Sequence, residues 1–284
     1  METYSYKTIK QGEKESNINF NIYRSEQPEK GIVLYFHGGG LIYGSRLDLP
    51  ALHKEKLLSA GYTILSFDYR LSPESKLDQI LSDSEDAVNF FLNNRKELSL
   101  SQSPYFLWGR SAGAYLALML SYREFKEKAS GVISFYGYGF MTDDWFKEPS
   151  NFYLKYPSIK DTTIENKIST LALTEGDINE RFIIYLYARQ RGLWLSMLTD
   201  ETSEGFMERY SLRFKEQNPM PAFFAYSFRD TDVPFKESIE LAKGFKSPST
   251  FSNSLDAHDF DRDESSPETI RLLDKMVDFL NFNI

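Results

Sequence analysis

The feature that most constrains the fold is a sharp turn from a strand into a helix, centred on Ser111. An apolar run of strand length covers residues 105–109, and residues 112–120 are good helix formers without a proline. Between them, Gly-x-Ser-x-Gly places small residues where side chains would collide in a tight corner. We predict a nucleophile elbow, with a strained Ser111 and the Ala112 amide at a helix N-terminus. A helix N-cap serine between turn glycines is the alternative.

Composition excludes several classes of protein. Of the 284 residues, 41% are hydrophobic, which is ample for a packed core. The net charge is −8 and no lysine- or arginine-rich run occurs, so we expect no nucleic-acid partner. The absence of cysteine excludes disulfides, cysteine nucleophiles and thiolate metal sites. We see no signal peptide and no apolar run of bilayer-spanning length, and therefore expect a soluble, cytoplasmic protein without a membrane partner.

Strand and helix patterns alternate along the chain. Residues 4–9 and 18–23 alternate in hydrophobicity around Gly12, which predicts an antiparallel hairpin. Further strands are predicted at 32–36, 63–67, 131–136, 222–226 and 250–252, and helices at 49–59, 77–92, 235–243 and 267–280. This order predicts an α/β fold with a mostly parallel sheet and helices on both faces. The acidic cluster 83–86 is interpreted as a helix start with a solvated face.

A glycine loop, His37-Gly38-Gly39-Gly40, follows the strand predicted at 32–36. Consecutive glycines let the backbone approach a ligand closely and point its amides into a site. A nucleotide site is excluded, because the Gly-x-Gly-x-x-Gly pattern and the lysine of a phosphate loop are both absent. We therefore predict an oxyanion hole made of the amides of Gly38, Gly39 and Ala112, with a plain flexible turn as the alternative.

Ser111 requires a base, and the chain contains three histidines. His37 opens the glycine loop, where we expect it to brace the backbone. His53 lies among charged residues in a predicted helix, which predicts a solvent-facing side chain. His258 follows the last predicted strand, near the carboxyl edge where open parallel sheets gather their active sites. We therefore predict that His258 is the base.

The carboxylate that orients His258 is expected in the loop after the strand at 222–226, which offers Asp230 and Asp232. The chain order Ser, Asp, His is the one expected of this architecture, but it does not separate the two. Asp232 lies beside Val233-Pro234, where a carboxylate favours nearby loop amides, as turn aspartates do. This spacing favours Asp230 as the acid and Asp232 as a brace of the loop.

Together these motifs resemble the α/β-hydrolase superfamily. The resemblance rests, in chain order, on His37-Gly38-Gly39-Gly40, Tyr69-Arg70-Leu71-Ser72-Pro73-Glu74, Gly109-Arg110-Ser111-Ala112-Gly113, Asp230-Thr231-Asp232-Val233-Pro234 and His258. The glycine loop is most similar to that of carboxylesterases related to hormone-sensitive lipase. Their acid is the first aspartate of Asp-x-x-Val-Pro, which implies Asp230. Arg110 stands where many of these esterases have aspartate, and Ala114 where they have glycine.

The resemblance implies a catalytic domain of residues 1–137 and 218–284, with a lid at 138–217 inserted after the sixth strand. Residues 178–198 contain more apolar side chains than a solvent-facing helix needs. We predict a hydrophobic substrate pocket beneath the lid, formed by Tyr138, Phe182, Trp194 and Met197. Ordinary packing of the lid onto the sheet is the alternative.

The predicted function is a serine hydrolase that cleaves small to medium carboxylic esters through an acyl-enzyme. Ser111 would attack the ester carbonyl, His258 would transfer protons and Asp230 would orient His258. We expect a small-molecule ester as partner and neither a cofactor nor a metal, and the sequence leaves a homo-oligomer open. An amidase or peptidase with the same triad is one alternative. A non-catalytic ligand-binding module on a hydrolase scaffold is the other.

Overall fold

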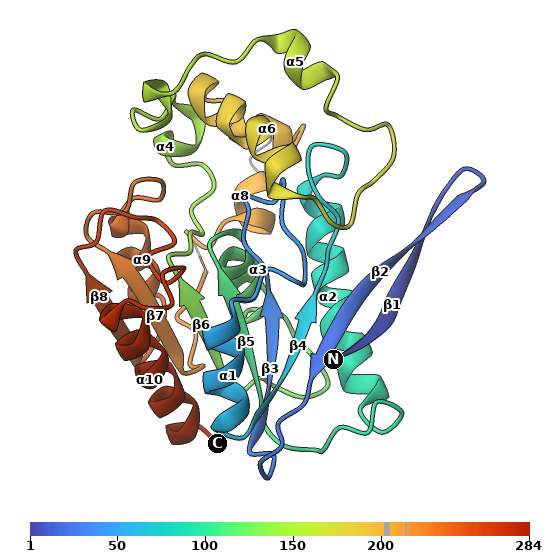
Figure 1. Ribbon diagram of the computed structural model, residues 1–284, viewed down its shortest axis with the longest axis vertical. Coiled ribbons are helices and arrows are strands. Elements are labelled where there is room, and N and C mark those ends of the chain that lie inside the picture. Colours follow the sequence, from blue (N-terminus) through green and yellow to red (C-terminus); the bar gives the residue numbers. More distant parts are fainter. Residues whose placement is uncertain (202–204, 214) are drawn as a thin grey trace.

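An eight-stranded sheet forms the centre of the computed structural model, which describes residues 1–201, 205–213 and 215–284 (Figure 1). The strand order is β1-β2-β4-β3-β5-β6-β7-β8. The strands are β1 (Glu2–Gln11), β2 (Lys14–Tyr23), β3 (Gly31–Phe36), β4 (Tyr62–Phe67), β5 (Tyr105–Arg110), β6 (Gly131–Phe135), β7 (Ala222–Ser227) and β8 (Pro248–Asn253). The pairings of β1 with β2 and of β2 with β4 are antiparallel, and all pairings from β4 to β8 are parallel.

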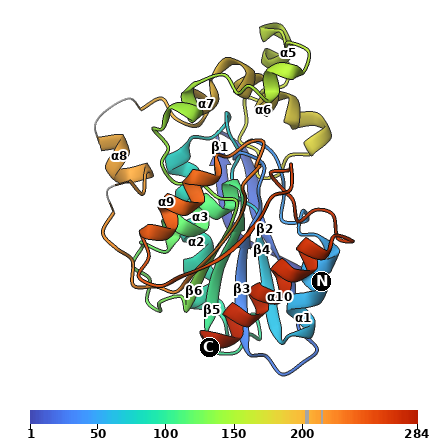
Figure 2. The same ribbon diagram turned by 90° about the vertical axis from the view of Figure 1, so that its left-hand side faces the viewer.

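Helices cover both faces of the sheet (Figure 2). On one face lie α2 (Leu77–Asn94), α3 (Ala112–Leu120) and α9 (Phe235–Lys243), and on the other lie α1 (Ala51–Ser59) and α10 (Pro267–Phe282). Every residue of β3 to β7 is buried, as expected for strands packed on both sides. The fold class predicted from the sequence is therefore confirmed. Within the described residues, no helix combines the length and the apolar character that crossing a bilayer requires.

The interpretation of residues 83–86 as a helix start is wrong, because α2 begins at Leu77, and the expected solvated face is wrong for Asp83. This residue lies in the second turn of α2, and its side chain is fully buried. Its carboxylate accepts hydrogen bonds from Lys7 Nζ at 2.7 Å and from Arg70 Nε at 2.6 Å. The ion pairs join α2 to β1 and to the segment after β4, a long-range pairing that the local charge pattern does not reveal.

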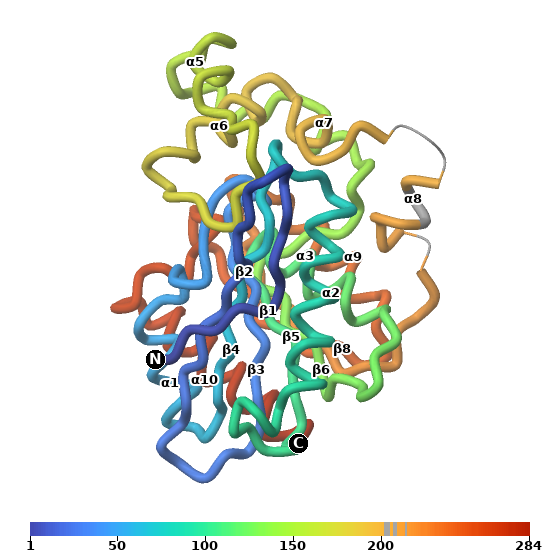
Figure 3. The backbone as a smooth tube through the Cα atoms, turned by 90° about the vertical axis from the view of Figure 1, so that its right-hand side faces the viewer, coloured from blue at the N-terminus to red at the C-terminus, as the bar shows by residue number. Residues whose placement is uncertain are grey.

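Residues 138–217, here called the insert, connect β6 to β7, and most of those that the structure describes lie beyond the carboxyl edge of the sheet (Figures 1 and 3). Its described elements are α4 (Asp144–Lys147), η1 (Tyr153–Lys155), α5 (Asp161–Glu165), α6 (Ile178–Arg191), α7 (Trp194–Leu198) and α8 (Gly205–Tyr210). Backbone hydrogen bonds of 2.8 and 2.9 Å join Gly176 to Gly44, and the Trp194 indole donates to the carbonyl oxygen of Gly40 at 3.0 Å. The insert is thus attached to the segment that contains the glycine loop.

Candidate active site

Ser111 lies at the corner between β5 and α3, with φ of 53° and ψ of −117°. A positive φ is unfavourable for a residue with a side chain, so the serine is strained as the elbow interpretation requires. A Cβ on Gly109 would come within 2.0 Å of the Gly113 backbone. A Cβ on Gly113 would come within 2.0 Å of the carbonyl oxygen of Phe36 at the end of β3. The two glycines therefore allow the elbow to close against the neighbouring strand.

Three side chains from distant segments meet at this corner. His258 Nε2 lies 2.8 Å from Ser111 Oγ, and His258 Nδ1 lies 2.8 Å from Asp230 Oδ2. The imidazole is 15% exposed and the carboxylate of Asp230 only 2%. The structure thus brings together the serine, the histidine and the acid that the sequence favours. A ring that donates Nδ1–H to Asp230 presents an unprotonated Nε2 to the serine hydroxyl.

The second oxygen of Asp230 fixes the loop that contains it. Asp230 Oδ1 accepts the backbone amides of Asp232 at 2.8 Å and of Val233 at 2.9 Å. The expectation that Asp232 accepts these loop amides is therefore wrong, because Asp230 accepts them while its other oxygen contacts His258. An aspartate whose amide partners lie two and three residues ahead forms a regular turn, and this turn sets the direction of its free oxygen.

Asp232 instead binds the insert. Its carboxylate accepts hydrogen bonds from the hydroxyls of Tyr185 at 2.7 Å and Tyr153 at 3.0 Å, and from Arg189 Nε at 3.2 Å. The side chains of the ion pair are 3% exposed for Arg189 and 6% for Asp232. A buried ion pair with additional hydrogen bonds holds its partners in one arrangement. The loop that positions the acid is therefore joined firmly to α6.

Nearby carboxylates control the charge of His258. Burial lowers the pKa of the imidazole, because the charged ring loses hydration. The carboxylate of Asp230 has the opposite effect and raises the pKa, and Asp232 and Asp259 raise it further. The resulting pKa of His258 is about 9. The protonated ring is the form that these carboxylates stabilise. The same carboxylates would stabilise the imidazolium that forms when a neutral ring takes the serine proton.

The glycine loop approaches the serine closely. A Cβ on Gly38 would lie 3.4 Å from Ser111 Cβ. Within the described residues, the amides of Gly38 and Gly39 have no hydrogen-bond acceptor, and Ala112 opens α3, where amides have no intrahelical acceptor. Three donors without acceptors thus belong to the loop and helix end that flank Ser111, as an oxyanion hole requires.

His37 braces this loop. It is fully buried, and its Nδ1 lies 2.8 Å from the carbonyl oxygen of Gly38. The Tyr69 ring stacks on the imidazole with 4.2 Å between centroids, and its hydroxyl donates to the His37 carbonyl oxygen at 2.7 Å. Burial lowers the pKa of His37, which favours a neutral ring. These contacts agree with the bracing role expected from the sequence.

A buried network that the sequence did not predict lies beneath the serine. The carboxylate of Asp261 accepts hydrogen bonds from Arg110 Nε at 2.9 Å, Arg110 Nη2 at 2.8 Å and the Tyr136 hydroxyl at 2.7 Å. His53 Nε2 lies 2.8 Å from the same carboxylate. The prediction of a solvent-facing His53 is wrong, since its side chain is fully buried. Arg110, an arginine at the corner of the elbow, was the available signal that a buried acid is present.

The cavity that contains Ser111 is small, with a volume of about 40 Å³. The glycine loop, His258, Tyr136, Tyr185 and Arg262 line it, together with Asp48, Asp232 and Asp259. Polar and aromatic side chains thus surround the serine, in place of the hydrophobic pocket expected from the sequence.

The four side chains predicted to form the pocket lie elsewhere among the described residues. Tyr138 and Trp194 are buried and pack edge to face, with ring centroids 5.2 Å apart. Phe182 contacts Tyr43 at 5.8 Å between centroids, and Met197 is half-buried against the main apolar core. Ordinary packing, the alternative stated above, describes these contacts. Helix α6 is apolar on several sides. Its docking on the glycine loop places Tyr185, and not Phe182, on the side that faces the serine.

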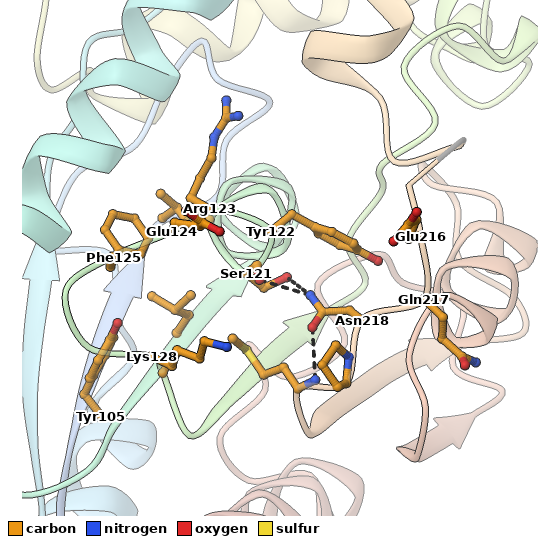
Figure 4. A pocket seen from close by; sticks show the side chains of 15 residues that line it. Tyr105, Ser121, Tyr122, Arg123, Glu124, Phe125, Lys128, Glu216, Gln217 and Asn218 are labelled. Atoms are coloured by element: carbon orange, nitrogen blue, oxygen red, sulfur yellow. Dashed lines mark hydrogen bonds between the residues drawn. The ribbon is translucent and has the colours of Figure 1, made fainter.

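A larger cavity, of about 710 Å³, lies at the opposite end of α3 from Ser111 (Figure 4). Residues 120–125 and 216–220 contribute most of its wall. The Asn218 amide, which is central in this view, donates to Ser121, and its oxygen accepts the amide of Met220. The nine residues of α3 separate this cavity from the serine by about 13 Å. The polar groups of Asn218 are thus already paired within the protein.

Comparison with known proteins identifies the family. The sequence model of the BD-FAE family matches residues 20–245, which include the elbow, the glycine loop and the aspartate loop. The chain belongs to the BD-FAE family. A crystal structure of a protein of unknown function from Staphylococcus aureus is 31% identical, with a TM-score of 0.87 and coverage of 100% of this chain and 99% of that one.

A second solved structure supports the fold of this BD-FAE family member. It is an alpha/beta hydrolase superfamily protein from Enterococcus faecalis, 28% identical, with a TM-score of 0.79 and coverage of 93% of this chain and 95% of that one. The resemblance to α/β-hydrolases found in the sequence is therefore confirmed. An acetyl esterase of Salmonella schwarzengrund is 28% identical over 102 residues, which are 36% of this chain and 32% of the relative. The chain thus matches about a third of the length of that esterase.

Proposed function

We propose that this chain is a serine hydrolase that cleaves carboxylic esters through an acyl-enzyme on Ser111. The observation that carries the proposal is the chain of two 2.8 Å contacts from Ser111 Oγ through His258 to Asp230. An adjacent base is what makes a serine hydroxyl nucleophilic at neutral pH. A ligand-binding module has no need of such a chain, so the geometry supports an enzyme.

Acylation begins when Ser111 Oγ forms a bond to the ester carbonyl carbon while its proton moves to His258 Nε2. The carbonyl oxygen becomes an oxyanion, which the amides of Gly38, Gly39 and Ala112 stabilise. Asp230 holds the imidazolium in place through Nδ1. The bond from carbon to the alcohol oxygen then breaks, and His258 gives its proton to the departing alcohol.

Deacylation repeats these steps with water. His258, neutral again, takes a proton from a water molecule, whose oxygen attacks the acyl carbon. The same amides stabilise the second oxyanion. The bond between the acyl carbon and Ser111 Oγ then breaks as His258 returns the proton to the serine. The products are a carboxylic acid and the regenerated enzyme. The insert is the lid in this proposal, because α6 and α7 contact the glycine loop from above.

An ester is favoured over an amide by the names of the relatives. The acetyl esterase of Salmonella schwarzengrund and an arylesterase of Saccharolobus solfataricus both match this chain, the latter with 32% identity over 96 residues. Amide cleavage by the same triad demands protonation of a much poorer leaving group. A comparison of p-nitrophenyl acetate with the matching p-nitroanilide therefore separates the two reactions.

A fluorophosphonate probe tests the proposal directly, because it reacts covalently with an activated serine. We expect single-site labelling of the wild type and hydrolysis of p-nitrophenyl acetate. Ser111→Ala should lose both, while its circular dichroism and melting curve remain those of a folded protein. Ser121→Ala, a buried serine at the far end of α3, is the matched control and should keep both activities. Labelling of Ser111→Ala, or no labelling of the wild type, would refute the proposal.

A further inference from the structure

The cavity around Ser111 limits what an ester can place there. A volume of about 40 Å³ has room for roughly three water molecules, since one needs about 10–15 Å³ measured in this way. An apolar cavity that holds a benzene ring measures about 150 Å³. The space beside the serine therefore has room for an acyl group of about two or three carbons.

Tyr185, in α6, forms part of the wall of this cavity. The residue is 3% exposed and lines the same cavity as Ser111 and His258. Its ring rests on the glycine loop, since a Cβ on Gly40 would lie only 2.5 Å from Tyr185 Cε2. Tyr185 thus lies directly over the segment that donates the amides of the proposed oxyanion hole.

Contacts on three sides hold the Tyr185 ring. Its hydroxyl donates to Asp232 Oδ2 at 2.7 Å. The Trp194 and Tyr153 rings meet it edge to face, with centroids 5.2 and 5.8 Å away and interplanar angles of 88° and 87°. Arg189 in turn fixes Asp232, through the ion pair of 3.2 Å. A ring held in this way cannot rotate aside for a longer acyl chain without breaking a buried hydrogen bond.

The other arm of the ester has more space. A groove of about 330 Å³ is lined by Ser45, Asp48 and residues 175–179. Asp48 lines both this groove and the cavity of Ser111, so one side chain borders both spaces. An ester bound with its carbonyl carbon at Ser111 can therefore extend its alcohol part toward the groove while its acyl part stays beneath Tyr185.

We propose that Tyr185 is the residue that limits the acyl group to about two or three carbons, with the alcohol part directed toward the groove beside Asp48. This inference rests on the proposed ester hydrolysis at Ser111. It adds a specificity-determining residue that takes no part in the proton transfers. The ring volume, and not the hydroxyl, excludes the longer chain.

The experiment measures kcat/KM for p-nitrophenyl acetate, butanoate, hexanoate and octanoate with the wild type and three variants. The ratio of hexanoate to acetate is read within one preparation, so the folded fraction cancels. The wild type should prefer acetate by at least about tenfold, the discrimination expected per misfitting methylene. Tyr185→Ala should raise the ratio by about tenfold or more, and Tyr185→Leu by less. Tyr185→Phe, which keeps the ring, should leave the ratio near that of the wild type.

Tyr156→Ala is the matched control, because it removes a tyrosine ring from the insert at a position that is 45% exposed. Its chain-length profile should equal that of the wild type. If Tyr185→Ala fails to fold, Tyr185→Leu decides, since it retains an apolar side chain beneath Trp194. An unchanged ratio in Tyr185→Leu and Tyr185→Ala, or a wild type that cleaves octanoate as well as acetate, overturns the inference. A wild type inactive on every ester refutes the proposed function instead.

Discussion

The guanidinium of Arg110 and the carboxylate of Asp261 form a buried bidentate pair, with nitrogen–oxygen distances of 2.9 and 2.8 Å. Arg110 directly precedes the candidate nucleophile, and Asp261 lies three residues after His258. The pair therefore joins the elbow to the loop that supplies the base. Burial alone would raise the pKa of Asp261, but Arg110 and His53 hold this pKa well below its usual range. The carboxylate thus stays ionised throughout the neutral range and its contribution to stability is lost only in acid.

We predict that Asp261→Asn destabilises the protein by about 3–5 kcal/mol, the usual cost of leaving a buried charge unpaired. Arg110→Met combined with Asp261→Asn should cost less than the sum of the single changes, by at least about 0.5 kcal/mol, because the pair acts as a unit. Urea unfolding of the four proteins measures this coupling. Additive effects would mean that the two side chains contribute independently.

The sequence located the three triad candidates because each belongs to a local pattern at the end of a strand. Ser111 lies between spaced glycines, His258 follows the last strand, and the turn chemistry around Asp230 depends on neighbours two and three residues away. Parallel strands then bring these loops to one edge of the sheet, so their meeting follows from the fold class. Their catalytic roles stay a prediction until the serine is tested.

The parts that the sequence did not predict depend on docking between distant segments. His53 in α1 is buried because it pairs with Asp261 and stacks on Trp108, although its sequence neighbours are charged. Tyr185 lies one turn from Phe182 on α6, and both are aromatic, so the sequence alone does not select the residue that faces the serine. The contact of Tyr185 with Gly40 and its hydrogen bond to Asp232, both long-range, make that choice.

The indole of Trp194 offers a test of the contact between insert and glycine loop, since it donates to the Gly40 carbonyl oxygen at 3.0 Å. Trp194→Phe keeps an aromatic ring and removes this donor. We expect a loss of about 1 kcal/mol in stability and a fall in kcat of up to about tenfold, because the oxyanion amides would be held less firmly. Trp145→Phe, in the same aromatic cluster, is the control. Equal effects of the two changes on kcat would contradict a specific role for Trp194.

The pH dependence of kcat/KM reports the protonation of His258. Only the neutral ring accepts the serine proton, so activity should rise with pH through the pKa of the free enzyme. The reference pKa of an imidazole is about 6.5. The surrounding carboxylates raise the pKa of His258 to about 9, so we expect the midpoint to lie above the reference value and toward the alkaline side. Rates measured across neutral and alkaline pH give the midpoint.

Asp259→Asn is the control for this profile, because it removes one of the carboxylates that raise the pKa of His258. Its midpoint should lie below that of the wild type. The raised pKa of His258 also stabilises the folded protein. This contribution is fully present below the unfolded pKa of about 6.5, and it is lost as the pH rises through the pKa of the folded protein. Activity that stays constant down to about pH 4.5 would rule out a histidine base.

The two aspartates of one loop give the sharpest test of the site. Asp230 contacts His258 Nδ1 at 2.8 Å, whereas Asp232 contacts Arg189 and Tyr185 of the insert. Loss of the orienting carboxylate costs roughly 10⁴-fold in kcat in serine proteases, and Asp230→Asn should show a loss of that order with the fold preserved. Asp232→Asn leaves Arg189 without its buried counter-charge, so it should cost about 3–5 kcal/mol in stability and far less in kcat.

Urea unfolding and steady-state kinetics on the same preparations separate these outcomes. Asp230 has a second task, since its Oδ1 accepts the amides of Asp232 and Val233 at 2.8 and 2.9 Å. Asparagine retains a side-chain oxygen for those amides, so the turn should survive in Asp230→Asn. Its NH2 group then faces the histidine and, unlike the carboxylate oxygen, cannot accept the Nδ1 proton. Alanine at the same position removes both functions and should add a loss of stability. If Asp232→Asn abolishes turnover while Asp230→Asn remains active, then Asp232 is the acid and the hydrogen bonds of this loop rearrange during catalysis.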